Sequence, residues 1–160
     1  MSPLSAEDDD ARAEFIEKFG LIVESVGWMP RMTGRLLGCL LVSDIPLTQA
    51  QLREKLGASL GSVSSSSRVL LSKRIAQRVS IPGSRQTGLQ LHPDPWRILE
   101  DDGLRTAHDY AQLASLTHDS LRDRESTAAR NLKRMRDYFA TVEDHGAQII
   151  AWLESTRDEK

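Results

Sequence analysis

A long, regular run of apolar positions near the C-terminus is the feature that most constrains the fold. These positions are spaced alternately three and four residues apart, which is the pattern of one apolar stripe along an α-helix. The stripe consists of Leu132, Met135, Phe139, Val142, Gly146, Ile149 and Leu153. The helix expected over residues 126–156 would be roughly 45 Å long at about 1.5 Å per residue. One small domain cannot cover such a helix well, so we expect a second chain to cover it.

Length and composition indicate one soluble domain. The chain has 160 residues, of which 39% are apolar and 28% are charged, and these values are typical of globular proteins. Its longest apolar run, residues 36–42, is far shorter than the roughly 20 residues that span a bilayer, so we expect no membrane partner. The chain opens on acidic residues instead of a basic and apolar leader, which argues against secretion and predicts a cytoplasmic protein.

Helical spacing of apolar residues extends through most of the chain and is interrupted once. Around Ile75 the period changes to the alternation of a β-hairpin, whose turn contains Gly83. Thr48 is a good helix N-cap, and Gly57 can end the short helix that follows it. The expected elements are helices over residues 8–26, 30–42, 49–56 and 61–74, a hairpin over 75–91, and long helices over 95–122 and 126–156.

Charge is distributed unevenly along the chain. Residues 31–92 contain nine Lys or Arg and two acids, a net charge of +7, whereas the remainder carries −9. A basic middle between acidic ends is expected when one region contacts a polyanion. The alternative is a chance fluctuation of solvated charge, but the basic stretch coincides with the segment described next.

Residues 48–74 have the pattern of a helix-turn-helix, in which the second of two short helices enters the DNA major groove. Setting Val63 and Leu70 inward leaves serines and Arg68 outward or lateral on the second helix. Serine can bond to bases or phosphates, and arginine reads guanine or binds phosphate. The hairpin would act as a wing whose tip carries Arg85 towards the minor groove. The predicted DNA contacts are Ser62, Ser64, Ser65, Arg68, Ser72, Lys73, Arg74, Arg78, Ser84 and Arg85.

Five stretches of the chain resemble a known family. They are WMPRMTGRLLG at 28–38, LGASLGSVS at 56–64, RVL at 68–70, VSIPGSR at 79–85 and HPDPW at 92–96. On these residues the chain resembles the GbsR-like branch of the MarR superfamily of bacterial transcriptional regulators, over about residues 10–155. It departs from the usual family pattern at Gly88-Leu89, where an aromatic residue is more common, and in the uniform serine run at 64–67.

The resemblance implies a mainly α-helical fold with a small β-hairpin wing, and a homodimer joined by its terminal helices that binds a pseudo-palindromic operator. We interpret the chain as a disordered N-terminus (1–7), an N-terminal dimerisation helix (8–27), a winged helix-turn-helix lobe (28–95) and C-terminal dimerisation helices (96–156). The predicted function is a DNA-binding transcriptional regulator, expected to be a repressor. The predicted dimerisation residues are Phe15, Phe19, Leu132, Met135, Phe139, Val142, Ile149 and Leu153.

Several further residues admit a functional and a structural interpretation. Aromatic and methionine side chains could hold an apolar or cationic small-molecule effector, although core packing is the simpler explanation. That candidate effector pocket comprises Trp28, Met29, Met32 and Trp96. Cys39 lies in an apolar stretch, which favours a buried structural thiol over a redox sensor. Arg31 and Arg35 could contact phosphate or simply be solvated.

Enzymatic chemistry and metal binding are not expected. The chain contains no nucleophile elbow, phosphate-binding glycine loop or metalloprotease helix, so we predict neither catalysis nor a cofactor. His108 and His118 are ten residues apart, which places their Cα atoms about 15 Å apart on a helix, too far to share a metal ion. Two other functions stay open: a winged-helix module that binds proteins and not DNA, and a ligand-binding helical dimer that regulates nothing.

Overall fold

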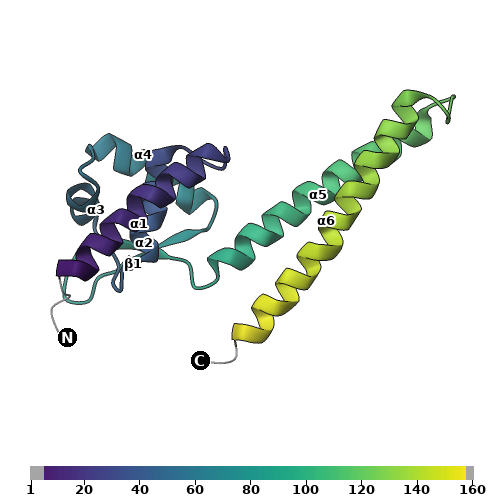
Figure 1. Cartoon of the computed structure of the whole chain (residues 1–160). Helices are drawn as coiled ribbons and strands as arrows, with labels where there is room; N and C mark the ends of the chain where they lie inside the picture. Colours follow the sequence, from purple (N-terminus) through teal and green to yellow (C-terminus); the bar gives the residue numbers. More distant parts are fainter. Residues whose placement is uncertain (1–5, 158–160) are drawn as a thin grey trace. The chain divides into compact units, whose positions relative to one another are not determined.

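The computed structural model describes residues 6–157. The chain divides into two compact units, with the boundary between Pro95 and Trp96. The elements are α1 (Ala6–Ser25), α2 (Arg31–Leu41), α3 (Gln49–Leu56), α4 (Leu60–Ser72), β1 (Ala76–Ser80), β2 (Thr87–Leu91), α5 (Pro95–Ser120) and α6 (Thr127–Arg157). These helices and the single hairpin confirm the predicted fold class (Figure 1).

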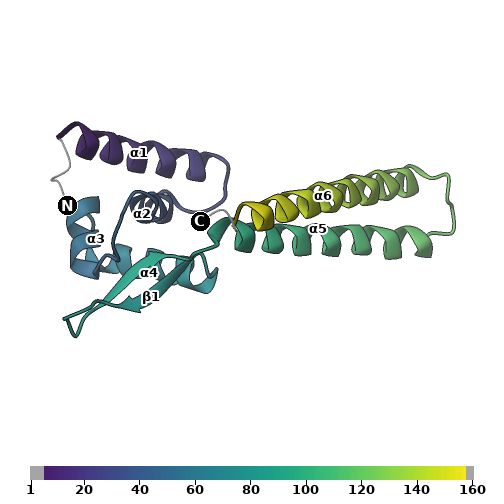
Figure 2. The same ribbon diagram turned by 90° about the horizontal axis from the view of Figure 1, so that it is seen from below.

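The first unit is built around α2, which is buried on most of its surface. Leu36, Leu37 and Leu40 form the centre of the core. Helix α1 lies directly across α2 (Figure 2), and the close approach depends on Gly34. A Cβ atom there would lie 3.0 Å from the Cβ of Val23 and 3.1 Å from the Cα of Gly20. Glycine at position 34 therefore lets the two helix backbones approach closely.

The helix-turn-helix forms as its capping residues predict. The Thr48 side chain accepts from the backbone N–H of Gln51, and the Gln51 side chain bonds back to the Thr48 backbone, so α3 begins with a capping box. Gly57 ends α3 in the left-handed conformation, with φ of 56°. The Ser59 side chain then caps α4. The buried residues that hold the two helices together are Leu52, Leu56, Val63 and Leu70.

The wing is an antiparallel pair of β1 and β2, with Ala76 opposite Leu91 and Ser80 opposite Thr87. Leu47 adds a bridge to Leu89, with N···O distances of 2.9 and 2.8 Å. No sequence pattern predicted this bridge, which ties the wing to the start of the helix-turn-helix. It also explains the glycine in β2, because a Cβ at Gly88 would lie 2.7 Å from the Cβ of Pro46.

The second unit consists of α5 and α6, which run antiparallel (Figures 1 and 2). The residue pairs that connect α5 and α6 occur in antiparallel order along the two helices. The rings of Tyr110 and Phe139 lie 4.8 Å apart, and His108 is hydrogen-bonded to Glu143 at 2.9 Å. Where α5 begins and α6 ends, Arg97 pairs with Glu154. The buried residues along the pair are small: Ala107, Ala111, Ala114, Ala129 and Gly146.

The element boundaries differ from the predicted ones by a few residues. Helix α1 begins at Ala6 instead of residue 8, so the described part of the segment predicted to be disordered, Ala6 and Glu7, is helical. The rest of that segment, residues 1–5, lies outside the described residues. Helix α4 ends at Ser72, because Arg74 adopts a φ of 60° and turns the chain into the wing. Across residues 6–157 no helix is long and apolar enough to span a membrane.

Candidate nucleic-acid interface

The exposed face of α4 is the centre of the candidate interface. Ser65, Arg68 and Ser72 are exposed, and Ser62 and Ser64 are half-buried. Val63 and Leu70 are fully buried on the opposite face, as predicted. This arrangement leaves short side chains around one arginine, which allows a helix backbone to lie close to base edges.

The last two serines of the run have another role. Ser66 and Ser67 are buried, and the Thr33 hydroxyl of α2 donates to the Ser66 hydroxyl oxygen at 3.3 Å. The uniform serine run therefore serves both faces of α4, since Ser65 faces solvent while the buried Ser66 bonds to Thr33 of α2.

The exposed serine hydroxyls donate to carbonyls of their own helix. Ser65 Oγ lies 2.9 Å from the Gly61 carbonyl oxygen, and Ser72 Oγ lies 2.9 Å from that of Val69. A hydroxyl that donates to the helix backbone keeps lone pairs that can accept. These serines are thus arranged as hydrogen-bond acceptors, which suits the amino groups of adenine and cytosine in the major groove better than phosphate oxygens.

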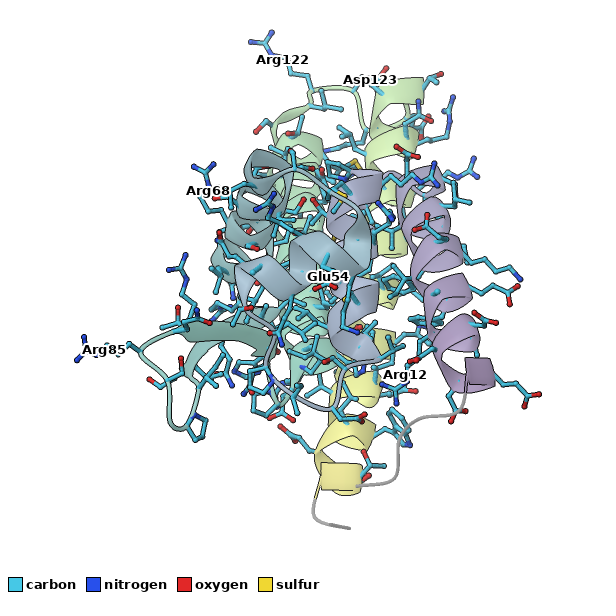
Figure 3. The ribbon with its side chains drawn as sticks, turned by 90° about the vertical axis from the view of Figure 1, so that its left-hand side faces the viewer. Arg12, Glu54, Arg68, Arg85, Arg122 and Asp123 are labelled. Atoms are coloured by element: carbon cyan, nitrogen blue, oxygen red, sulfur yellow. The ribbon has the colours of Figure 1, made fainter. Side chains whose placement is uncertain are left out.

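Cationic side chains surround this face. Arg68, Lys73, Arg74, Arg78 and Arg85 are all exposed. Figure 3 shows Arg68 and Arg85 projecting away from the first unit on the same side, one from α4 and the other from the wing. No hydrogen bond or ion pair joins the Arg68 or Arg85 side chain to another residue of the 6–157 region, so both guanidinium groups are available to an anion.

The wing tip has a defined conformation. The backbone N–H of Ser84 donates to the Ile81 carbonyl at 3.1 Å, and that of Gln86 donates to Ser84 Oγ at 3.1 Å. Gly83 adopts a φ of 75° within this turn. The predicted contact Ser84 therefore shapes the loop that presents Arg85.

A small cleft of about 100 Å³ lies beside the wing. Its lining includes Leu52, Ser67, Arg78 and Leu89, and the buried Ser67 hydroxyl has no hydrogen-bond partner among the described residues. None of the four residues predicted for an effector pocket lines this cleft.

The four residues of the predicted effector pocket occur in both units. In the first unit Met29 is buried, and Trp28 and Met32 are half-buried. In the second unit Trp96 is 46% exposed. Met29 thus contributes to the core of the first unit, and an effector role for these four residues stays a prediction.

The predicted dimerisation residues mostly face their own chain. Phe19 packs beside Gly38 of α2, and Leu132, Met135, Phe139, Val142 and Leu153 are half-buried. Phe15 and Ile149 are the exposed members of the set. Helices α5 and α6 also carry large exposed apolar side chains, and of these only Ile149 belongs to the predicted stripe. We call this set the outer apolar face, and it comprises Leu113, Leu116, Tyr138, Ile149 and Trp152.

Arg31 and Arg35 both pair with Glu17 of α1, so neither is simply solvated. Arg35 Nε donates to Glu17 Oε1 of α1 at 2.7 Å, and Arg31 pairs with Glu17 Oε2 at 3.2 Å. Cys39 is buried nearby. Burial raises the pKa of the Cys39 thiol, against weaker opposing effects of Lys55 and Arg35, so the thiolate that a redox sensor requires is disfavoured.

The histidines take part in local hydrogen bonds. His108 Nδ1 is hydrogen-bonded to Glu143. His118 Nδ1 lies 3.2 Å from Asp119 Oδ1 and 3.0 Å from Arg124 Nη1, and Arg124 Nη1 also donates to Asp119 Oδ1 at 3.1 Å. Over the described ranges, no three His, Cys, Asp or Glu side chains come together as a group that could hold a metal ion.

Comparison with known proteins gives two informative similarities. The chain is 34% identical over 133 residues to the HTH-type transcriptional regulator MmpR5 of Mycobacterium tuberculosis (strain ATCC 25618 / H37Rv), covering 82% of this chain and 79% of that protein. It also resembles a solved structure described as the crystal structure of a transcriptional regulator. That likeness has a TM-score of 0.73 and 29% identity, and it covers 91% of this chain and 99% of the other. No protein-family model matches the chain.

Proposed function

Because the chain belongs to the family of HTH-type transcriptional regulators that includes MmpR5, we propose that it binds double-stranded DNA and regulates transcription. The observation that carries this proposal is the face shared by α4 and the wing. Arg68 and Arg85 project from these two elements to the same side of the first unit (Figure 3). The short side chains of Ser65 and Ser72 are exposed on α4, three residues before and four residues after Arg68.

In this proposal α4 enters the major groove. Arg68 reads guanine or binds a phosphate, and the exposed serines accept hydrogen bonds from base amino groups. Arg85 reaches the adjacent minor groove, where narrow A·T-rich segments attract arginine. Lys73, Arg74 and Arg78 contact phosphates, and these contacts orient the protein without reading sequence.

We further propose that the functional protein is a homodimer on a pseudo-palindromic operator. The outer apolar face of α5 and α6 supports this, because Leu113, Leu116 and Trp152 are more than half exposed in one chain, and large apolar patches on a monomer commonly mark interaction surfaces. Two-fold symmetry would then set the half-sites about 34–36 Å apart. The two recognition helices would lie in successive major grooves on one side of the duplex.

The finer proposals concern regulation. We propose membership of the GbsR-like branch and a repressor mode, in which a small-molecule effector releases the operator. An effector can act only through different affinities for the DNA-competent and DNA-incompetent states. In the first unit, Trp28, Met29 and Met32 are the residues proposed to bind it.

Fluorescence anisotropy of the purified chain tests the DNA proposal. The probes are duplex DNA from the region upstream of its own gene and a scrambled duplex, each at several salt concentrations. The proposal predicts tight, salt-sensitive binding that favours the upstream duplex, because phosphate contacts release counterions. The absence of binding even at low salt would contradict it and favour a winged-helix module that binds another protein.

A further inference from the structure

The side chain of Arg35 connects three helices of the first unit. Its Nε donates to Glu17 Oε1 of α1 at 2.7 Å, and its Nη2 donates to the Leu56 carbonyl oxygen at the end of α3 at 3.0 Å. Arg35 itself belongs to α2. One guanidinium group therefore links the N-terminal helix to the end of the first helix of the helix-turn-helix.

The path of this side chain depends on a glycine in α1. A Cβ at Gly20 would lie 2.6 Å from Cγ of Arg35 and 3.1 Å from the Arg31 carbonyl oxygen. The Arg35 stem thus passes over the bare backbone of α1, and its side chain is 21% exposed. Because the stem is enclosed between the helices, a shift of α1 relative to α2 would displace the guanidinium group.

The Leu56 carbonyl, which accepts from Arg35, belongs to the last residue of α3. The last carbonyls of a helix lack partners within the helix and carry the negative end of its dipole. At the end of α3 the Arg53 and Glu54 carbonyls accept from Ala58 and Gly57, and Arg35 supplies the donor for Leu56. The turn that follows leads directly to Ser59, which caps the recognition helix α4.

We infer that Arg35 is a positioning residue, which couples the location of α1 to the turn that precedes α4 and thereby sets the affinity for DNA. Glu17 is its anchor on α1, because its two carboxylate oxygens hold Arg35 and Arg31. This inference rests on the proposed DNA-binding function. It assigns Arg35 an internal role, whereas a phosphate contact would require the guanidinium group to face solvent.

The two roles predict opposite effects of Glu17→Gln. If Arg35 positions the turn, loss of the carboxylate weakens DNA binding. If Arg35 contacts phosphate, loss of its acidic partner frees it and strengthens binding. Glu14→Gln is the matched control, because Glu14 lies on the same helix and pairs with Lys18 of α1 alone, so it removes the same charge without touching Arg35.

The experiment measures the Kd of the full chain for the upstream duplex at several salt concentrations, for wild type and both variants. We expect Glu17→Gln to bind about fivefold more weakly than Glu14→Gln, a change that corresponds to a modest difference in binding free energy. The slope of log Kd against log salt should stay unchanged, since no phosphate contact is lost. Equal or tighter binding by Glu17→Gln than by Glu14→Gln would overturn the inference.

A second measurement needs no DNA. Amide hydrogen exchange over residues 57–60 should be faster in Glu17→Gln than in Glu14→Gln, and Arg35→Lys should exchange similarly fast, because an ammonium lacks the fork that reaches both acceptors. Unchanged exchange in this turn would overturn the coupling. If the wild type itself does not bind DNA, the proposed function fails, whereas the exchange result still decides whether Arg35 controls the turn.

Discussion

The two units of this chain bury different kinds of side chain. The first unit encloses large residues, and Leu36, Leu52 and Leu70 are fully buried. The second buries mainly alanines and one glycine, while Leu116 and Trp152 are more than 60% exposed. Its larger apolar residues, such as Leu132 and Phe139, are only half-buried. Because apolar burial contributes roughly 25 cal/mol per Å² of buried surface, the second unit gains less from the hydrophobic effect than the first.

Because of this difference, the first unit can be stable by itself, whereas the second unit is expected to need a partner chain for full stability. The first unit has the closed core of an independent domain and can present the DNA-binding surface. The second unit leaves large apolar side chains exposed, and this outer apolar face is the surface that the proposed dimer would cover. Four predictions test this comparison, from the largest expected effect to the smallest.

Leu70→Ala and Leu116→Ala remove the same atoms from helices of the two units. Leu70 is 0% exposed and Leu116 is 63% exposed. We expect Leu70→Ala to reduce the free energy of unfolding by about 3 kcal/mol, as buried leucine truncations do, and Leu116→Ala to have a much smaller effect on the single chain. Urea unfolding at low protein concentration measures both changes. Equal losses would show that the two units do not differ in this way.

Leu116→Asp should dissociate the proposed dimer. A carboxylate within an apolar interface costs about 2–3 kcal/mol or more, which corresponds to a dissociation constant raised roughly a hundredfold. Sedimentation equilibrium measures it. Leu116→Met keeps the apolar surface and should remain dimeric, whereas a Leu116→Asp variant that stayed dimeric would place the interface elsewhere.

Arg85→Ala should weaken DNA binding and reduce the salt slope by about one, because one phosphate or minor-groove contact is lost. Arg122→Ala is the control, since Arg122 is also exposed but belongs to the second unit. Anisotropy titrations at three or more salt concentrations compare them. An equal loss for the two variants would mean that Arg85 contributes only general charge.

Protonation of Asp137 at low pH should destabilise α6, and we expect this effect to be the smallest of the four. Hydrogen bonds from Lys133 and Arg136 lower the pKa of the Asp137 carboxyl. A lowered pKa in the folded state means that the ionised group stabilises the fold above its usual pKa and that this contribution disappears as pH falls through the lowered one. Asp137→Asn should therefore flatten the loss of helicity below about pH 4, measured by circular dichroism. An acid profile of Asp137→Asn identical to that of the wild type would contradict this prediction.

The sequence predicted the elements well because their ends carry local signals. Thr48 and Gly57 mark both ends of α3 through capping chemistry that needs no tertiary information. The Leu47 bridge was missed because one apolar residue between Pro46 and Thr48 has no strand period. It forms only when β2 lies alongside, which is a tertiary event.

The site was less predictable, for three physical reasons. Ser66 and Ser67 are buried although serine carries no apolar signal, so the pattern could not separate them from their exposed neighbours. The partner of Arg35 lies 18 positions earlier in the chain, beyond any helical spacing. The apolar period of α6 located one stripe, but it could not show that Phe139 faces Tyr110 of its own chain while Trp152 faces outward.

Sedimentation velocity with a fluorescently labelled upstream duplex tests the central claim most directly, because it reports DNA binding and the number of chains together. The claim is that the first unit binds DNA and that the second unit pairs two chains. We predict that the free protein sediments as a dimer and that each duplex carries two chains, with no complex of one chain at intermediate saturation. A monomeric free protein that binds the duplex one chain at a time, with unchanged affinity, would contradict it.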